Sequence, residues 1–328
     1  MESLLLGPDD VEESVDVSTL VAAVEGAFGA YARGDVQMPA KSYIDLPQYD
    51  GDFRSMPAYV ETEDWEAAGV KWVNSHAENP DRHNLPTVMG TMIYSDPETA
   101  LPLALLDGTS LTRLRTGAAA AVATRYFARD DATSLGLVGA GIQSYAQLEA
   151  IAVVRDIERV VISDRSDEAI AEFKRRYGET YAVEEGTIEE AATCDIVSTT
   201  TPVRKPIVDR VGEQTHVNAM GADAKGKQEL NPDILLNAKL VIDDYKQCTH
   251  SGEINVPWSE RLLDDSNIHA ELGDVVTGEA AGRTPEDGVT VFDSTGLAIQ
   301  DVAAAHAVYE RATESGRGTA FPLVGTET

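Results

Sequence analysis

Residues 133–144 read TSLGLVGAGIQS, and this stretch decides the fold class of the chain. A short apolar run ends in the turn Gly139-Ala140-Gly141, and the run 142–154 (IQSYAQLEAIAVV) has the composition of a helix. Strand, glycine turn and helix in this order form the setting in which G-x-G-x-x-G, here ending in Ser144, binds a dinucleotide. The turn, with Ile142 and Gln143 at the helix start, is predicted to hold a pyrophosphate through backbone N–H groups and the helix dipole. A turn that only packs the helix against the strand is the alternative.

The second apolar strand of this region, ERVVISD, ends at Asp164. A carboxylate at that position accepts hydrogen bonds from ribose hydroxyls and repels a 2′-phosphate, which favours NAD. Arg165 follows directly and offers a partner to a 2′-phosphate, so NADP is not excluded. Asp164 also has an ordinary structural role open to it, in capping the next helix beside Ser166.

Apolar strands alternate with helical segments from about residue 132 to residue 295. The further strands are TYAVEE, CDIVSTTTP, THVNAMG, KLVIDD and VTVFDST. Such alternation predicts βαβ units and an α/β fold with a Rossmann-type, doubly wound parallel sheet. The last helix, around LAIQDVAAAHAVYERA, is expected to return to the N-terminal region. The predicted domains are therefore 119–305, inserted, and 1–118 with 306–328, discontinuous.

The N-terminal region has a different pattern. Residues 1–34 are predicted to form one or two helices, with the apolar spacing LVAAVEGAFGAY in the second. Short strands are predicted between residues 40 and 107, and an Ala-rich helix follows in SLTRLRTGAAAAVATRYFA. Strands joined by short turns favour an α+β domain of antiparallel character.

The charge of the chain is strongly acidic. Acidic residues outnumber basic ones by 56 to 26, for a formal net charge of −30, and only 8 Lys accompany 18 Arg. The acids are scattered over helical segments, so such a surface repels nucleic acid and anionic membranes. Salt near 1 M screens self-repulsion beyond about 3 Å. We therefore expect a halophilic protein from a salt-rich cytoplasm; an ordinary acidic protein is the alternative.

Other features of the sequence exclude several classes of protein. No apolar run reaches the roughly 20 residues that span a membrane, and the acidic start MESLLLGPDDVEES is unlike a signal peptide. Two cysteines, Cys194 and Cys248, fit a reducing compartment. A cytoplasmic location is expected. The six histidines show no zinc-ligand spacing, so no metal site is predicted.

Nine segments together resemble the ornithine cyclodeaminase/μ-crystallin family, and within it most of all the archaeal alanine dehydrogenases. They are MPAK (38–41), RSMPAY (54–59), VKWVNSH (70–76), LPTVMG (85–90), LTRLRTGA (111–118), GLVGAGIQS (136–144), NAMGADAKGKQEL (218–230), HSGEIN (250–255) and VFDSTGLAIQDVA (291–303). The resemblance implies that the discontinuous domain binds substrate and forms a homodimer. It also implies oxidation of amines, or reduction of imines, beside a carboxylate.

Three cations of the first domain are candidates for binding that carboxylate: Lys41, Arg54 and Lys71. An arginine grips a carboxylate with two parallel hydrogen bonds. Lys71 resembles the family lysine beside the reacting carbon, and neighbouring cations lower an amine pKa enough for proton exchange. Solvated surface charges are the alternative for all three.

Asp223 resembles the family's catalytic aspartate, which would exchange a proton during imine formation or hydrolysis. A turn residue that caps its own loop is the alternative. By the same resemblance Arg115 is expected at the cofactor pyrophosphate. Further cofactor contacts are expected at Thr87, Thr200, Met220, Lys227 and Ser294. For Thr200 and Ser294 ordinary hydrogen bonding at a strand end is the alternative.

The residue at position 54 discriminates among the reactions of the family. Cyclodeaminases carry a carboxylate just before the Met-Pro pair, where it holds the distal ammonium of ornithine. This chain has Arg54 there, and a buried cation repels such an ammonium. The sequence therefore favours an NAD-dependent alanine dehydrogenase acting on pyruvate and ammonium. The alternatives are an ornithine cyclodeaminase, a cyclic ketimine (pyrroline-2-carboxylate) reductase, and a non-catalytic, μ-crystallin-like protein that binds cofactor and ligand.

Overall fold

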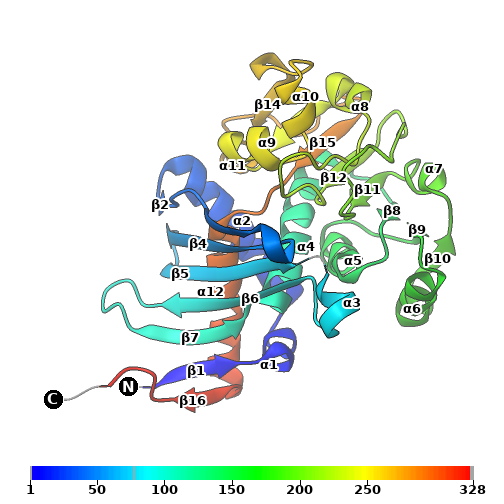
Figure 1. Cartoon of the computed structure of the whole chain (residues 1–328). Helices are drawn as coiled ribbons and strands as arrows, with labels where there is room; N and C mark the ends of the chain where they lie inside the picture. The colour runs from blue at the N-terminus through cyan, green and yellow to red at the C-terminus, as the bar shows by residue number, and fades with distance from the viewer. Residues whose placement is uncertain (1, 77, 326–328) are drawn as a thin grey trace. The chain divides into compact units, whose positions relative to one another are not determined.

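The computed structural model describes residues 2–76 and 78–325 (Figure 1). The chain divides into two compact units, Met1–Arg115 with Leu297–Thr328, and Thr116–Gly296. The divisions expected at 118/119 and 305/306 fall inside helices α4 (Gly108–Phe127) and α12 (Ala298–Ser315). Helix α12 lies wholly in the first unit because its apolar side packs on that unit's sheet.

An eight-stranded sheet forms the first unit, in the order β16-β1-β7-β6-β5-β4-β2, with β3 paired to β4. Its strands are β1 (Ser3–Leu6), β2 (Val36–Gln37), β3 (Ser42–Leu46), β4 (Gly51–Glu61), β5 (Glu66–His76), β6 (Val88–Ser95), β7 (Pro102–Asp107) and β16 (Thr319–Phe321). All pairs are antiparallel except β1 with β7. The predicted antiparallel character of this region is thus largely confirmed.

The prediction of helix throughout residues 1–34 is wrong at its start. Ser3–Leu6 is strand β1, which joins the sheet between β7 and β16. Four apolar or small residues cannot show a helical period, and only the distant strands decide their conformation. Helices α1 (Pro8–Glu13) and α2 (Val17–Arg33) follow.

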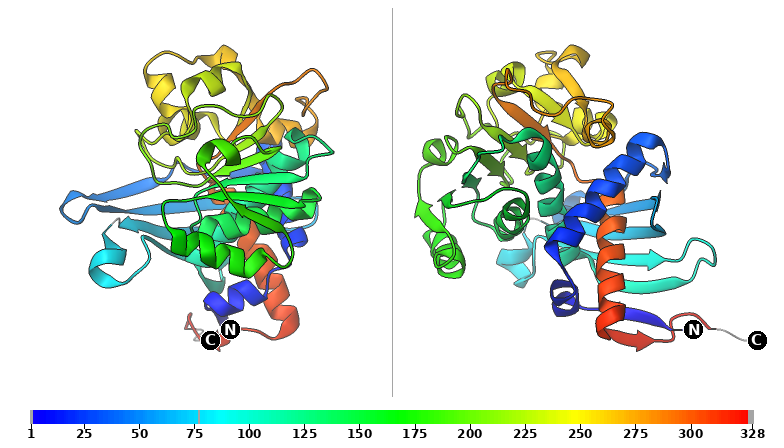
Figure 2. Two further views of the ribbon diagram at one scale, coloured as in Figure 1. Left: turned by 90° about the vertical axis from the view of Figure 1, so that its right-hand side faces the viewer. Right: turned by 180° about the vertical axis from the view of Figure 1, so that it is seen from behind.

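Helices α2 and α12 pack side by side on one face of this sheet, as the rear view in Figure 2 shows. Helix α2 begins at its N-cap Asp16, whose side chain accepts from Thr19 N, and ends at Gly34 in the left-handed region. The sheet residues that face the two helices are buried, among them Met56, Ala58, Met92 and Leu106. Every second residue of β4 to β7 therefore points into the core of the unit. The short elements α3 (Asn79–His83) and η1 (Pro47–Tyr49) lie in connections.

The second unit holds an eight-stranded sheet in which every pair is parallel. The strand order is β10-β9-β8-β11-β12-β15-β13-β14. The strands are β8 (Ser134–Val138), β9 (Arg159–Ser163), β10 (Ala182–Glu185), β11 (Ile196–Thr199), β12 (His216–Ala219), β13 (Lys239–Ile242), β14 (Ile268–Glu271) and β15 (Thr290–Asp293). Seven of them coincide with predicted strands, and β14 was missed. The order reverses between β8 and β11, which is the topological switch point of a Rossmann-type sheet.

Apolar clusters cover both faces of this parallel sheet. Leu135, Leu137 and Ile162 face one cluster, which α5 (Ile142–Val154) and α6 (Asp167–Tyr177) complete. Val161, Val197 and Val217 face the other. The remaining helical elements are α7 (Ile188–Ala191), α8 (Pro232–Asn237), α9 (Tyr245–Ser251), α10 (Asn255–Ser259), η2 (Asp265–Asn267) and α11 (Leu272–Thr277). The predicted doubly wound α/β fold, inserted into a second α+β unit, is confirmed.

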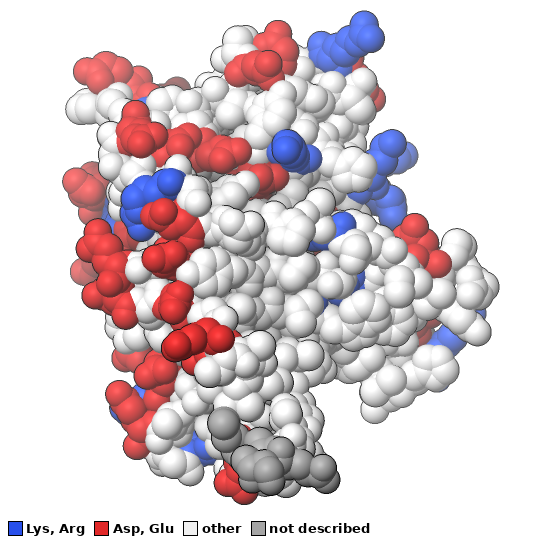
Figure 3. Space-filling view, turned by 90° about the vertical axis from the view of Figure 1, so that its left-hand side faces the viewer, with Lys and Arg blue, Asp and Glu red and all other residues white. Residues whose placement is uncertain are grey.

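Acidic side chains are prominent on the face of the molecule shown in Figure 3, in keeping with the net charge of −30. Asp and Glu side chains crowd one side of the face shown in Figure 3, while much of the rest of that face carries no charge. Among the described residues, no helix combines the length and the apolar character that a bilayer crossing demands. Both cysteines, Cys194 and Cys248, are buried and unbridged.

Candidate active site

Lys71 is the most deeply buried cation of the first unit, with 1% of its side chain exposed. It lies on β5, opposite Met56 of β4 and Met92 of β6, and points toward the helix-covered face. Its Nζ donates to Oδ1 of Asp301 at 2.6 Å and to Oγ1 of Thr112 at 3.1 Å. An ammonium group held this way has a fixed position and two fixed hydrogen-bond partners.

Asp301 is shared by a second buried cation. Arg115 Nε donates to the same Oδ1 at 3.0 Å, and its Nη1 donates to Oε1 of Gln300 at 3.1 Å. The other oxygen, Oδ2, is buried and has no hydrogen-bond partner among the described residues. One carboxylate therefore balances two cations, which leaves the cluster with an excess positive charge.

The surroundings of Lys71 change its acidity. The pKa of Lys71 is lowered from 10.5 to about 7; burial is the largest cause, the positive charges of Arg115 and Lys41 also lower it, and Asp301 raises it. A buried amine titrates low because the low dielectric disfavours its charged form. At neutral pH Lys71 is populated both as amine and as ammonium, which is the property of an efficient general acid or base.

The other two predicted substrate cations lie near Lys71, and the register of the sheet places Arg54 on the same face. Arg54 of β4 lies opposite Val73, two places along β5 from Lys71, so both side chains belong to one face. Lys41 directly precedes β3 and is near enough to lower the pKa of Lys71. The structure thus brings together Lys41, Arg54 and Lys71, three cations that are scattered in the sequence.

Arg54 has a partner that sequence reasoning missed. Its Nε and Nη2 each lie 2.9 Å from Oδ2 of Asp52, and its guanidinium lies over the ring of Tyr43 at 5.7 Å. Asp52 Oδ1 accepts from the backbone N–H of Ser75. Asp52 therefore holds Arg54 in one orientation and offsets part of its charge. The repulsion of a distal ammonium expected from Arg54 alone is correspondingly weaker.

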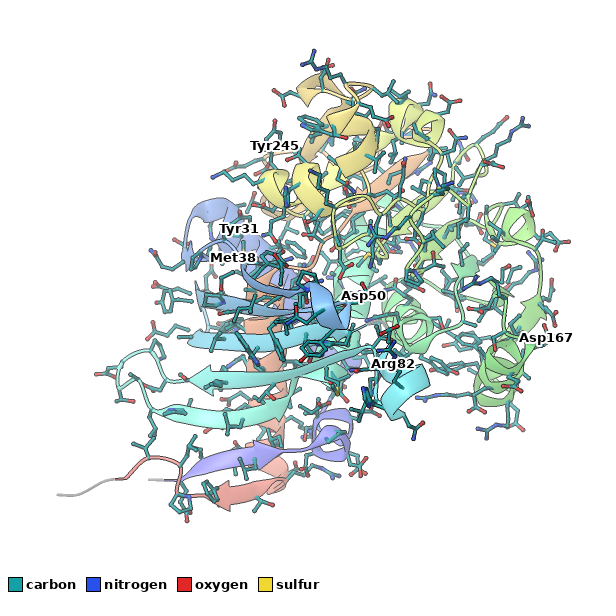
Figure 4. All side chains as sticks on the ribbon, in the orientation of Figure 1. Tyr31, Met38, Asp50, Arg82, Asp167 and Tyr245 are labelled. Atoms are coloured by element: carbon teal, nitrogen blue, oxygen red, sulfur yellow. The ribbon has the colours of Figure 1, made fainter. Side chains whose placement is uncertain are left out.

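Thr87, a predicted cofactor contact, lies outside this cluster. It is exposed just before β6, and its carbonyl accepts from His76 N. A hollow in the same part of the unit is lined by Tyr49, His76, Glu78, Asn79, Arg82 and His83. Figure 4 marks Arg82 on α3 and Asp50 in the β3–β4 connection. Arg82 is paired with Glu78 at 2.8 Å.

The glycine turn of the second unit connects β8 to α5 as predicted. Gly139 has φ +107°, a conformation that L side chains rarely adopt, and a Cβ there would lie 3.0 Å from Thr200 Oγ1. Gly141 is the N-cap of α5, and a Cβ built on it would meet nothing within 4 Å. Among the described residues nothing accepts from the N–H groups of Ile142 and Gln143. Free amides beside open space at a helix start fit a diphosphate.

Asp164 lies over this turn. Its Oδ2 accepts from Ala140 N at 2.7 Å and its Oδ1 accepts from Ser166 N at 2.8 Å. It therefore also serves the start of α6, where Ser166 is the N-cap. A carboxylate has about four lone-pair sites, so Asp164 keeps acceptor capacity for ribose hydroxyls. Arg165 is exposed beside it.

The remaining predicted residues of this unit gather at the carboxyl edge of the sheet. Thr200 follows β11 and Met220 follows β12, with backbone N–H groups bonded to Val138 O and Thr199 O. Ser294 follows β15 and donates its hydroxyl to Asp243 Oδ2 at 2.9 Å. In open parallel sheets this edge is where ligands bind.

Asp223 and Lys227, predicted for catalysis and for cofactor binding, are ion-paired. Lys227 Nζ lies 2.6 Å from Asp223 Oδ1, and both side chains are partly exposed. The loop that carries them is tied to Asn255, which accepts from Gly226 N and donates to Lys227 O. Among the described residues no group of His, Cys, Asp and Glu has the arrangement of a metal site.

Two residues of the lysine cluster had no predicted role, the buried Asp301 and the partly buried Thr112, although both belong to segments matched to the family. The available signal was a lone acid in the apolar helix LAIQDVAAA. A carboxylate in a buried helix face needs a cation for a partner. The sequence does not show which cation, since Lys71 is 230 positions away.

Comparison with known proteins agrees with the fold and with these motifs. The model of the ornithine cyclodeaminase/mu-crystallin family matches residues 1–316. The chain belongs to this family. It is 46% identical over 323 residues to an alanine dehydrogenase of Archaeoglobus fulgidus, which covers 97% of this chain and 98% of the relative.

Two solved structures are similar over almost the whole chain. An archaeal alanine dehydrogenase dimer with bound NAD has a TM-score of 0.93 and 45% identity, covering 99% of this chain and 100% of the other. The Δ1-pyrroline-2-carboxylate reductase of Thermococcus litoralis, in complex with NADH and L-proline, has a TM-score of 0.90 and 35% identity. The match covers 96% and 99% of the two chains.

Proposed function

We propose that this protein is an NAD-dependent alanine dehydrogenase that aminates pyruvate reductively with ammonium and NADH and catalyses the reverse deamination. The observation that carries the proposal is the buried Lys71, whose pKa is about 7, which shares a sheet face with Arg54 and is close enough to Lys41 to feel its charge. The 46% identity to an alanine dehydrogenase supports the choice of substrate.

The cations of the first unit suit a small substrate with one carboxylate. Arg54, oriented by Asp52, presents a planar guanidinium of the kind that binds carboxylates in two-point contact. Lys41 adds a second positive charge near Lys71. We assign Arg54 and Lys41 to the carboxylate of pyruvate or alanine, and Lys71 to the carbon beside it.

The proton transfers of the reaction match the titration of Lys71. Ammonia adds to the carbonyl carbon of pyruvate, and the ammonium form of Lys71 protonates the oxygen so that it leaves as water. The resulting iminium carbon accepts a hydride to give alanine; the bound cofactor supplies that hydride. We assign to Asp223 a second proton-transfer role and the balancing of the iminium charge. In deamination each step runs backwards, with Lys71 as the base.

The cofactor is assigned to the second unit as NAD. The free N–H groups of Ile142 and Gln143 and the open space at Gly141 suit the diphosphate. Asp164 suits the adenine ribose. Thr200, Met220 and Ser294 lie at the same carboxyl edge and are assigned to further contacts. Arg115, which the family resemblance puts at the diphosphate, contributes here to the Lys71–Asp301 cluster.

A second candidate is reduction of a cyclic ketimine such as Δ1-pyrroline-2-carboxylate. The similarity to the Thermococcus litoralis reductase favours it. The same cations would hold the carboxylate, and the imine would need protonation but no ammonia. This reaction differs from alanine formation in the larger substrate and in the absence of the ammonia-addition and dehydration steps.

The test is a substrate panel followed by absorbance at 340 nm with NADH and NADPH at high salt. Loss of NADH with pyruvate and ammonium, and not with pyruvate alone, supports the alanine dehydrogenase. Faster turnover of Δ1-pyrroline-2-carboxylate without ammonium identifies a ketimine reductase. Ammonia release from ornithine without net change of NADH identifies a cyclodeaminase, and NADH binding with no turnover a binding protein.

We also propose that the protein is a homodimer formed through the open face of its first sheet. Several of the residues that alternate with the helix-facing ones are apolar and accessible: Ile44 is 53% exposed and Trp72 is 43% exposed, and Phe53 stacks on Trp72. Patches of this kind mark protein contacts. Light scattering should give the mass of two chains, and Trp72→Glu should give one; a single-chain mass for the unaltered protein contradicts the dimer.

A further inference from the structure

Glu229 is a fully buried carboxylate to which the reaction above gives no role. It accepts four hydrogen bonds. Its Oε2 receives Thr199 Oγ1 at 2.7 Å and Gly221 N at 3.0 Å, and its Oε1 receives Thr201 N at 2.7 Å and Thr201 Oγ1 at 2.6 Å. Both oxygens thus act only as acceptors, which a carboxylate does and an amide cannot.

These four donors belong to the ends of two neighbouring strands. Thr199 and Thr201 flank Thr200 at the carboxyl end of β11, and Gly221 follows Met220 at the end of β12. A Cβ at Gly221 would lie 2.4 Å from Glu229 Oε2 and 2.5 Å from Thr201 O. Only glycine leaves the carboxylate room to join the two strand ends.

The effect of this clamp extends to the glycine turn. Thr200 N donates to Val138 O, and its Oγ1 would lie 3.0 Å from a Cβ on Gly139. Glu229 therefore fixes, through Thr199 and Thr201, the residue that lies against the first glycine of the turn.

A second buried carboxylate, Glu253, binds the backbone of Glu229 and does not contact the two strand ends. Glu253 Oε1 accepts from the backbone N–H of Glu229 at 2.9 Å and of Leu230 at 2.6 Å, whereas its Oε2 receives only Glu229 N at 3.1 Å. Burial and the charge of Glu229 raise the pKa of Glu253 well above its usual value. Burial raises the pKa of Glu229 as well, while its hydrogen bonds from Thr201, Thr199 and Gly221 lower it. Because each oxygen of Glu229 accepts a backbone N–H, we assign the proton of the pair to Glu253.

We propose that Glu229 is a positioning residue for the dinucleotide: its ionised carboxylate holds Thr200 and Met220 in the arrangement that binds cofactor. This inference rests on the proposed function, since it presupposes that the carboxyl edge of the sheet binds NADH. It goes beyond that function in assigning cofactor affinity to a buried residue that does not touch the cofactor and acts on it through the ends of β11 and β12.

The experiment compares Glu229→Gln with Glu253→Gln in the full-length protein. In Glu229→Gln one backbone N–H, of Thr201 or of Gly221, faces an amide NH₂ and loses its acceptor. The dissociation constant of NADH, measured by fluorescence titration, should rise at least about tenfold, with a matching rise in the KM for NADH. Glu253→Gln keeps the bonds made through Oε1 and mimics the protonated acid, so its affinity should stay within about threefold of the unaltered protein.

Two further measurements separate positioning from general stability. Hydrogen exchange of the backbone amides of Thr201 and Gly221 should be faster in Glu229→Gln than in the unaltered protein. Exchange of the amides of β9, which do not bond to Glu229, should be unchanged. If Glu229→Gln does not fold, Thr199→Val removes a single donor at nearly constant volume and should still weaken NADH binding measurably. Unchanged NADH affinity in Glu229→Gln overturns the inference. If Glu229→Gln does not fold, unchanged NADH affinity in Thr199→Val overturns it. Failure of the unaltered protein to bind NADH refutes the proposed function instead.

Discussion

Nζ of Lys71 lies 2.6 Å from Oδ1 of Asp301, and neither side chain is accessible to solvent. The same oxygen receives Nε of Arg115 at 3.0 Å. The carboxylate comes from α12 and the cations from β5 and α4, so the balance of charge forms only when the C-terminal segment packs against the sheet. The acidity of Lys71 is therefore a property of the folded first unit.

Replacing Asp301 should shift the pH dependence of the reaction to lower pH. Asp301 raises the pKa of Lys71, against the lowering by burial, so Asp301→Asn lowers that pKa below about 7. Amination of pyruvate needs the ammonium form, and the loss of kcat/KM with rising pH should begin about one unit or more earlier. The measurement is kcat/KM for pyruvate against pH at constant free ammonia.

The control for Asp301→Asn is Glu314→Gln, which removes an exposed carboxylate from the same helix. Its pH profile should coincide with that of the unaltered protein. Coincident profiles for Asp301→Asn as well would show that Lys71 does not titrate in the reaction. Because Asp301→Asn leaves Arg115, and Lys71 wherever it stays protonated, buried without a counter-charge, we also expect a loss of about 3–5 kcal/mol in unfolding free energy.

Gly141→Ala should weaken cofactor binding without loss of stability. The backbone of Gly141 is extended, and an added methyl meets no atom within 4 Å. The methyl would nevertheless occupy space through which the diphosphate approaches the turn. We expect the dissociation constant of NADH to rise about tenfold or more while the melting temperature stays level.

Gly26→Ala is the matched control, because Gly26 lies within α2 and its added methyl also meets nothing within 4 Å. It should bind NADH normally and gain about 0.5–1 kcal/mol of stability. Normal NADH binding by Gly141→Ala would place the diphosphate elsewhere.

Asp164→Ser should weaken the preference for NADH over NADPH. Serine can still accept from Ala140 N, but the charge that repels a 2′-phosphate is gone and Arg165 remains beside it. The ratio of kcat/KM for the two cofactors should fall about tenfold or more. The double variant Asp164→Ser/Arg165→Ala should lose the NADPH activity that Asp164→Ser gains. An unaltered ratio of kcat/KM for the two cofactors in Asp164→Ser would disprove the role of Asp164 at the ribose.

Salt should stabilise the protein, in line with our proposal that it is halophilic. With a net charge of −30, self-repulsion is screened within about 3 Å near 1 M salt. The melting temperature should rise steadily from about 0.1 M to about 2 M KCl, well beyond the range in which moderately charged proteins respond. A melting temperature that stays flat or falls would identify an ordinary acidic protein.

Local patterns were sufficient to predict most of the second unit. Most of the parallel strands there are short apolar runs bounded by turn residues. The turn at Gly139 needs a positive φ, which glycine adopts readily. Strand β14 escaped prediction because IHAE has only four residues, too few for its alternation of apolar and polar side chains to be distinguished from chance. Strand β1 escaped because its four residues acquire their conformation from β7 and β16.

The sequence by itself determined the parallel sheet, the glycine turn and the presence of cations in the strands of the first unit, because these depend on residue type and on spacing along a few positions. Only the tertiary structure decided that Asp301 is the partner of Lys71, that Asp52 holds Arg54, and that Glu229 joins two strand ends. Each of these pairings involves a charged side chain that is wholly or partly buried, and the packing of helices and strands far apart in the sequence determines which residue becomes its partner. Sequence spacing alone therefore does not reveal these pairings.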